Sequence, residues 1–288
     1  DICGEIRQGS PPAHDSLRSL TFIHTRKIAC HSRLLHTASI PRSPRTAMKD
    51  LHVPRIDARY WTAITLASVF GTNLGDLYAH DSGLGILGGL PILAAIVALA
   101  YLLERRDNSR HEAWYWLAII VIRTGATNIA DYLCGRHYLG WNRFALSAGL
   151  AAVIAAVVWR GARSAAGRSG LPQTDVRYWT AMLAAGVLGT ALGDALQRLM
   201  GQGVASAALL AVLLVVLVFN RRAAALTLLA YWFTVCIART AGTAIGDLLA
   251  EHEKLGIGLN ASTALSGLLF VGVLLLWRTR PQSDISAG

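Results

Sequence analysis

Four aspartates recur at equivalent positions of this chain, each inside an otherwise apolar segment. They are Asp76, Asp131, Asp194 and Asp247, and a threonine stands four residues before each one: Thr72, Thr127, Thr190 and Thr243. Residues four apart lie on the same face of an α-helix, so we expect each carboxylate and hydroxyl to point the same way. These hard oxygen ligands favour magnesium, calcium or manganese. The pattern therefore predicts a cation-binding site formed by these eight side chains.

Two arginines would set the local charge of this site. Arg123 and Arg239 stand eight residues before Asp131 and Asp247, whereas the other two copies carry no charge at that position. Four aspartates and two arginines leave two net negative charges, which would suit one divalent cation. The same groups would also serve a proton-linked pathway, because a carboxyl group away from water can hold a proton.

A purely structural role for the aspartates stays open. Each arginine could neutralise the aspartate of its own copy as a buried pair, and each aspartate could bond neighbouring backbone near its helix end. If the arginines pair in this way, neutralising Asp131 or Asp247 is expected to cost more folding stability than neutralising the aspartates of the other two copies.

The aspartates belong to a fourfold repeat. A Tyr-Trp pair opens each copy, and the tryptophan stands fifteen residues before the aspartate in every case: Trp61, Trp116, Trp179 and Trp232. The first and third copies begin Arg-Tyr-Trp-Thr-Ala, and the second and fourth carry the arginine, so the order is A-B-A-B. Tryptophans gather at membrane–water interfaces. We expect these four to be interface anchors, with each aspartate about 22 Å further along its helix.

Composition and hydropathy indicate a membrane protein. Of the 288 residues, 53% are hydrophobic and 15% are charged, against about 25% charged in soluble domains. Eight apolar segments approach the roughly 20 residues that span a bilayer. They lie near 59–79, 84–103, 113–134, 142–160, 177–199, 203–219, 223–250 and 256–277. We predict an all-α integral membrane protein whose eight transmembrane helices form four parallel helical-hairpin repeats, at about 57–106, 112–163, 175–222 and 223–280.

The charge pattern predicts the orientation. Basic residues follow the even-numbered segments, ending with Arg278 and Arg280, and such residues mark the cytoplasmic side. Both termini are therefore expected in the cytoplasm. The net charge of +10 is spread in small clusters between apolar runs, so we expect the lipid bilayer, not nucleic acid, as partner. The sequence leaves the oligomeric state open.

Residues 1–47 differ from the membrane domain at 48–288. They are rich in Arg, Ser and His and contain no long apolar run, so we expect them to be disordered. Met48 directly precedes the organised part. This favours upstream sequence translated from a wrongly chosen start, and an organellar transit peptide is the alternative.

The repeat pattern resembles a family of bacterial membrane proteins assembled from four tandem copies of a repeat of unknown function. Each copy in that family has two transmembrane helices and a characteristic tryptophan, and the resemblance covers roughly residues 57–278. It implies the architecture and supplies no chemistry. We expect a location in the bacterial inner (cytoplasmic) membrane.

These observations lead to two hypotheses of function. The first is a transporter or channel for a small cation, either a divalent metal or a proton, that uses the ring of four aspartates. The alternative is a non-transporting membrane scaffold or partner subunit with structural aspartates. The sequence contains no H-E-x-x-H, no G-x-S-x-G and no phosphate-binding glycine loop, so we do not expect an enzyme.

Overall fold

The computed structural model describes residues 54–81, 83, 85–106, 112–164, 175–222, 227–252 and 256–277, without the side chains of 81, 104–106, 161–164 and 222. The expectation for residues 1–47 lies outside the described residues. Arg278 and Arg280, on which the predicted orientation partly depends, lie outside them as well.

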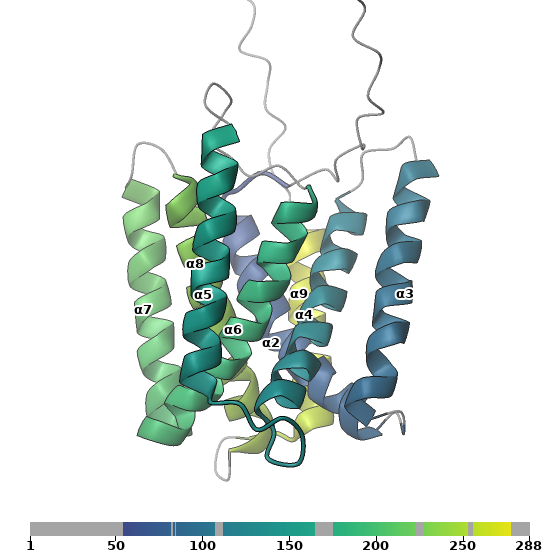
Figure 1. Cartoon of the computed structure of the whole chain (residues 1–288), viewed down its shortest axis with the longest axis vertical. Helices are drawn as coiled ribbons and strands as arrows, with labels where there is room; N and C mark the ends of the chain where they lie inside the picture. The colour runs from purple at the N-terminus through teal and green to yellow at the C-terminus, as the bar shows by residue number, and fades with distance from the viewer. Residues whose placement is uncertain are drawn as a thin grey trace, which may run out of the picture. The chain divides into compact units, whose positions relative to one another are not determined.

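The described residues form eight helices and no strand (Figure 1). They are α2 (Ala58–Asp81), α3 (Gly85–Arg106), α4 (Ala113–Cys134), α5 (Arg143–Ser164), α6 (Val176–Met200), α7 (Gln202–Arg222), α8 (Leu228–Glu251) and α9 (Leu259–Leu276). Seven are long and apolar enough to cross a membrane, and α2 has 24 residues but is less apolar. The prediction of an all-α multi-pass membrane protein is confirmed.

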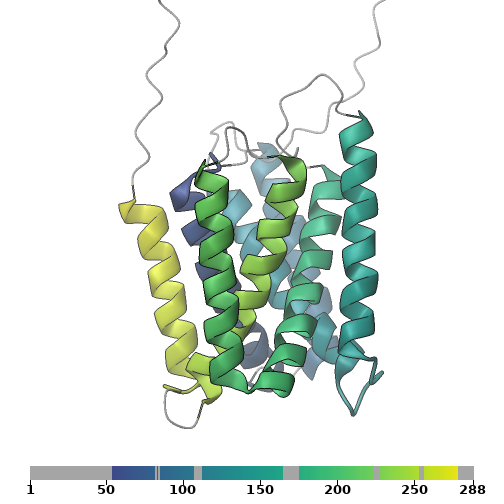
Figure 2. The ribbon, with the colours of Figure 1, turned by 90° about the vertical axis from the view of Figure 1, so that its left-hand side faces the viewer.

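The helices form two layers. The aspartate-bearing helices α2, α4, α6 and α8 form a closed inner ring, in which each packs against the next and α8 packs against α2. In α4, α6 and α8, 61–67% of the most apolar stretch is buried, against 11–22% in the outer helices α3, α5, α7 and α9. The inner helices therefore carry the polar residues, and the outer helices present apolar surface to lipid. Helices that follow one another in the chain run in opposite directions, so α2 begins and α9 ends at the same end of the bundle (Figure 2).

Each outer helix covers the inner helix of the following repeat. Helix α3 packs mainly on α4, α5 on α6 and α7 on α8, and α9 closes the circle on α2. The second helix of one hairpin thus completes the next hairpin. Because a hairpin alone would leave its inner helix uncovered, we infer that the four repeats fold as one interlocked unit.

Small residues allow the inner helices to approach closely. A Cβ added at Gly71 of α2 would lie 2.7 Å from the Cβ of Arg123 on α4. Between α4 and α6 the small and large positions are exchanged. Helix α6 has Gly186 at the position of Arg123 in α4, and a Cβ added at Gly186 would lie 2.6 Å from the Cβ of Ala126 on α4. Small residues permit such backbone approach between membrane helices. The residue just before each motif threonine is thus matched in size to the residue opposite it.

This packing can be tested with Gly242→Ala. An added Cβ there would overlap the Ser68 side chain and lie 3.1 Å from the Ser68 carbonyl carbon. Overpacking of this kind costs about 1–3 kcal/mol, so we expect a lower melting temperature in detergent. The matched control is Gly149→Ala on α5, where nothing lies within 4 Å and alanine favours the helix by about 0.5–1 kcal/mol. Equal melting temperatures for the two variants would contradict this account.

Candidate functional site along the bundle axis

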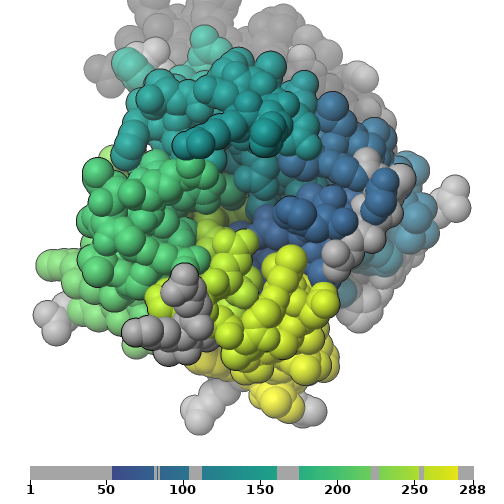
Figure 3. Space-filling view, turned by 90° about the horizontal axis from the view of Figure 1, so that it is seen from below, coloured from purple at the N-terminus to yellow at the C-terminus, as the bar shows by residue number. Residues whose placement is uncertain are grey.

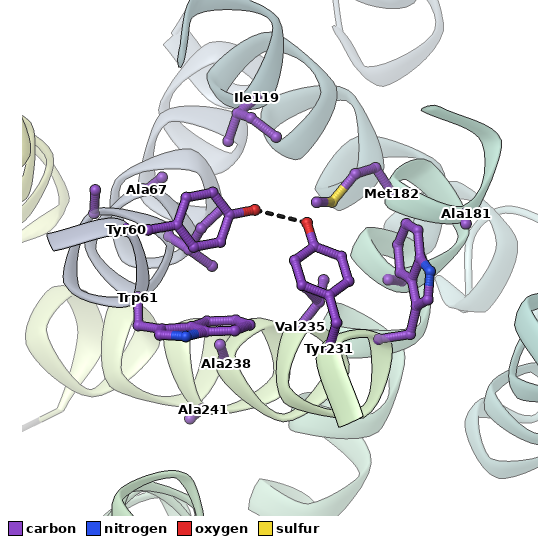
Figure 4. Close-up of a cluster of buried hydrophobic side chains, with 14 of the residues drawn as sticks. Tyr60, Trp61, Ala67, Ile119, Ala181, Met182, Tyr231, Val235, Ala238 and Ala241 are labelled. Carbon is purple, nitrogen blue, oxygen red and sulfur yellow. Dashed lines mark hydrogen bonds between the residues drawn. The ribbon is translucent and has the colours of Figure 1, made fainter. Parts of the chain in front are cut away.

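A closed ring of four tyrosines lies near the start of the inner helices. The hydroxyl oxygens of Tyr60 and Tyr115 are 2.9 Å apart, and those of Tyr115 and Tyr178 are 2.6 Å apart. The ring continues from Tyr178 to Tyr231 at 3.0 Å and returns to Tyr60 at 2.6 Å. Figure 4 shows the Tyr60 and Tyr231 hydroxyls pointing toward each other. A hydroxyl donates one hydrogen bond and can accept others, so each can satisfy both neighbours.

The repeat tryptophans pack around this ring. Each lies against the tyrosine of the preceding copy, with ring centroids 5.5–5.9 Å apart, and Trp61 closes the cycle on Tyr231. Trp61, Trp116 and Trp232 are only 3–8% exposed, and Trp179 is partly buried. Their role as interface anchors stays a prediction. The sequence signal for the tyrosines is the Tyr-Trp pair that opens all four copies, but that pair alone does not predict a ring.

The guanidinium of Arg239 on α8 is fully buried and donates hydrogen bonds to all three other inner helices. Its backbone acceptors are the carbonyl oxygens of Ser68, Arg123 and Gly186, at 3.0, 3.1 and 3.4 Å. Its side-chain acceptors are the hydroxyls of Thr72, Thr127 and Thr190, at 3.3, 2.9 and 3.3 Å. One side chain therefore joins the four repeats at the axis.

Three of the motif threonines, Thr72, Thr127 and Thr190, converge on Arg239 and not on the aspartates. The hydroxyl oxygen of the fourth motif threonine, Thr243, lies 3.3 Å from that of Thr72. Among the described residues no hydrogen bond joins a motif threonine to a motif aspartate. The hydroxyls therefore surround a cation that belongs to the chain itself.

The four aspartates are partly buried, near the opposite end of the inner helices from the tyrosine ring. Figure 3 shows the bundle from this end, where segments of all four repeats are visible. The Oδ2 atom of Asp194 lies 3.4 Å from Nε of Arg143, and Oδ2 of Asp247 accepts a hydrogen bond from Gln197 at 2.6 Å. Asp76 and Asp131 have no hydrogen bond or ion pair from their carboxylates to another described residue.

The structure does not show the pairing of each arginine with the aspartate of its own copy, which the sequence left open. Within the described part of the chain, neither Arg123 nor Arg239 lies within 4.0 Å of a carboxylate, and the motif ion pair joins Asp194 to Arg143 instead. No three His, Cys, Asp or Glu side chains among these residues lie close enough together to hold a metal ion. The aspartates thus act as separate groups in this structure.

Fold and site define an all-α, multi-pass membrane protein built from an internal repeat. Three segments, residues 59–107, 177–225 and 230–282, match the family model described as Repeat of Unknown Function (DUF347). The matched segments cover half of the chain, and the chain belongs to this repeat family. The copy expected at 112–163 lies outside them, although it has the same motif spacing and its helix α4 takes part in the inner ring. No match was found among curated proteins or solved structures.

The tyrosine ring predicts a specific stability difference. Tyr178→Phe removes the hydroxyl that contacts Tyr115 and Tyr231, so we expect a loss of about 1–3 kcal/mol from the hydroxyls left unpaired. The control is Tyr78→Phe, because the buried Tyr78 hydroxyl has no hydrogen-bond partner among the described residues, and its removal should be neutral or stabilising. Denaturant unfolding in detergent measures both. The ring would have no energetic role if both variants matched the wild type.

The two buried arginines should differ when each is replaced by lysine. An ammonium group cannot reproduce the planar contacts of Arg239 with three helices. Hydrogen bonds to charged groups are worth about 1.5–3 kcal/mol, so Arg239→Lys should lower stability by at least that much. Arg123→Lys should cost less, because the Arg123 side chain makes one hydrogen bond to the described residues, to Ser68 at 2.5 Å. Thermal unfolding of both variants checks the order, and a larger loss for Arg123→Lys would contradict it.

Proposed function

We propose that this protein is a proton-linked transporter of the bacterial inner membrane, with both termini in the cytoplasm, and that its repeat aspartates bind the proton. The observation that carries the proposal is the presence of four partly buried carboxylates at the same position of each inner helix. Ionisable groups inside a membrane are costly, and they are functional candidates for that reason. Asp76 and Asp131, which lack partners among the described residues, are the first candidates.

The geometry favours a proton over a divalent metal. Calcium takes six to eight oxygen ligands and magnesium needs near-ideal octahedral geometry, whereas Asp194 and Asp247 contact different side chains. A single carboxylate is enough to bind a proton. The buried guanidinium groups of Arg123 and Arg239 would also repel a divalent cation.

The same arginines would prevent a proton leak. An arginine in a narrow polar pathway raises an electrostatic barrier to protons and cations. Along α4 and α8, Arg123 and Arg239 lie between the tyrosine of the ring and the aspartate. Aspartates could then exchange protons at one end of the bundle without a continuous proton path through it.

The competing hypothesis is a membrane scaffold with structural aspartates. The contacts of Asp194 with Arg143 and of Asp247 with Gln197 favour it, because each joins two different helices of the bundle. Under this hypothesis the loss of a carboxylate would weaken the fold and nothing else.

Proton flux in liposomes separates these hypotheses. The purified chain is reconstituted with a pH-sensitive dye inside, and gradients of sodium nitrate, sodium phosphate or magnesium chloride are imposed at fixed membrane potential. We expect a protein-dependent proton flux with at least one gradient, and a tenfold or greater loss in the double variant Asp76→Asn/Asp131→Asn with little change in melting temperature. The control is Glu112→Gln, which removes a carboxylate paired with Arg59 before α4 begins and should keep the flux.

Three outcomes would overturn the proposal. The first is no protein-dependent proton flux with any gradient, which favours the scaffold. The second is full flux in the double variant, which removes the aspartates from the mechanism. The third is magnesium uptake without proton movement, which returns the aspartates to metal transport.

A further inference from the structure

Arg123 is a buried cation with two free donors. Its side chain belongs to a residue that is 3% exposed, and only Nη1 is engaged, by the hydroxyl of Ser68. Nε and Nη2 have no hydrogen-bond partner among the described residues. These two nitrogens form one edge of the guanidinium, with nearly parallel N–H groups. That edge is the fork that binds carboxylates and other oxyanions through two hydrogen bonds at once.

A third free donor, on Trp116, lies on the same face of α4. Trp116 stands seven residues before Arg123, two helical turns away, and it is also 3% exposed. Its indole Nε1 likewise has no partner within the described part of the chain. The Trp116 ring packs 5.8 Å from that of Tyr60, and Arg123 reaches Ser68, so both side chains turn toward α2. Because helical side chains lean toward the helix N-terminus, Arg123 extends in the direction of Trp116.

The charge balance at this place favours an anion. No carboxylate of the described residues lies within 4.0 Å of the Arg123 guanidinium, and the second buried cation, Arg239, donates to the Arg123 carbonyl at 3.1 Å. A buried charge without a partner is strongly unfavourable, and each unpaired buried donor adds a further cost. All the free groups in question are donors. A ligand that carries negative charge and only accepts hydrogen bonds would satisfy them together.

We propose that the seam between α2 and α4 binds a small planar oxyanion, of the size of nitrate, bicarbonate or formate. Nε and Nη2 of Arg123 hold two of its oxygens, and the indole N–H of Trp116 faces the same seam. Binding follows from these contacts alone. The further step, that this anion is the transported solute, rests on the function proposed above.

Calorimetric titration of the purified full-length chain in detergent tests the site. The probes are sodium nitrate and sodium formate, with sodium chloride as a spherical anion of the same charge. We expect nitrate and formate to bind the wild type at least tenfold more tightly than chloride. Arg123→Lys keeps the charge but loses the fork, so planar-anion affinity should fall at least tenfold. Trp116→Phe should weaken it by threefold or more.

The matched control is Arg143→Lys, the same replacement at the arginine that pairs with Asp194, which should leave anion binding unchanged. The proposal is overturned if nitrate and formate give no binding heat with the wild type, if chloride binds as tightly, or if Arg123→Lys binds like the wild type. If Arg123→Lys does not fold, wild-type affinity in Trp116→Phe overturns it equally. Nitrate binding without any proton flux in liposomes would keep the site and refute the transporter.

Discussion

The burial of one guanidinium constrains the whole bundle. The desolvation cost of burying the Arg239 guanidinium is offset only if hydrogen-bond acceptors surround it in good geometry. Those acceptors come from each of the other inner helices. The helices must therefore stand at one spacing and one register. Gly189, against which the Arg239 side chain packs, allows this approach. The tyrosine ring then joins the same four helices about eight residues, or roughly 12 Å, nearer their starts.

The fourfold pattern is broken at the position that matters most. Ser68, Arg123, Gly186 and Arg239 are equivalent in the repeat, yet one guanidinium occupies the axis. Gly186 contributes no side chain there and instead offers its carbonyl to Arg239. Arg123 consequently turns aside to Ser68 and keeps two free nitrogens. Two arginines related by duplication thus have different surroundings: Arg239 joins the helices, and Arg123 has two nitrogens without a hydrogen-bond partner among the described residues.

The sequence predicts the elements and the repeat well because both depend on local patterns. Hydropathy and motif spacing place all eight helices within a few residues of their observed ends, except the start of α8 at Leu228. The pattern cannot tell that α9 packs on α2, since ring closure depends on contacts between distant segments. The absence of an ion pair between Arg239 and the aspartate of its own copy has a simpler cause. A helical side chain leans toward the N-terminus, and Arg239 therefore extends away from Asp247, which lies eight residues further on.

The order of charges along the axis links the two proposals. Arg123 and Arg239 stand eight residues before Asp131 and Asp247. Because arginine side chains lean toward the start of the helix, each guanidinium lies on the order of 15 Å from the aspartate carboxylates. At an effective dielectric constant near 20, two unit charges at that separation interact by about 1 kcal/mol. Protonation of an aspartate removes its repulsion of an anion at Arg123 by that amount, which is roughly a sixfold gain in affinity. Under the two proposals, direct contact between the sites is therefore unnecessary: proton binding at one end of the bundle would favour anion binding at its middle, and the anion would in turn favour the proton.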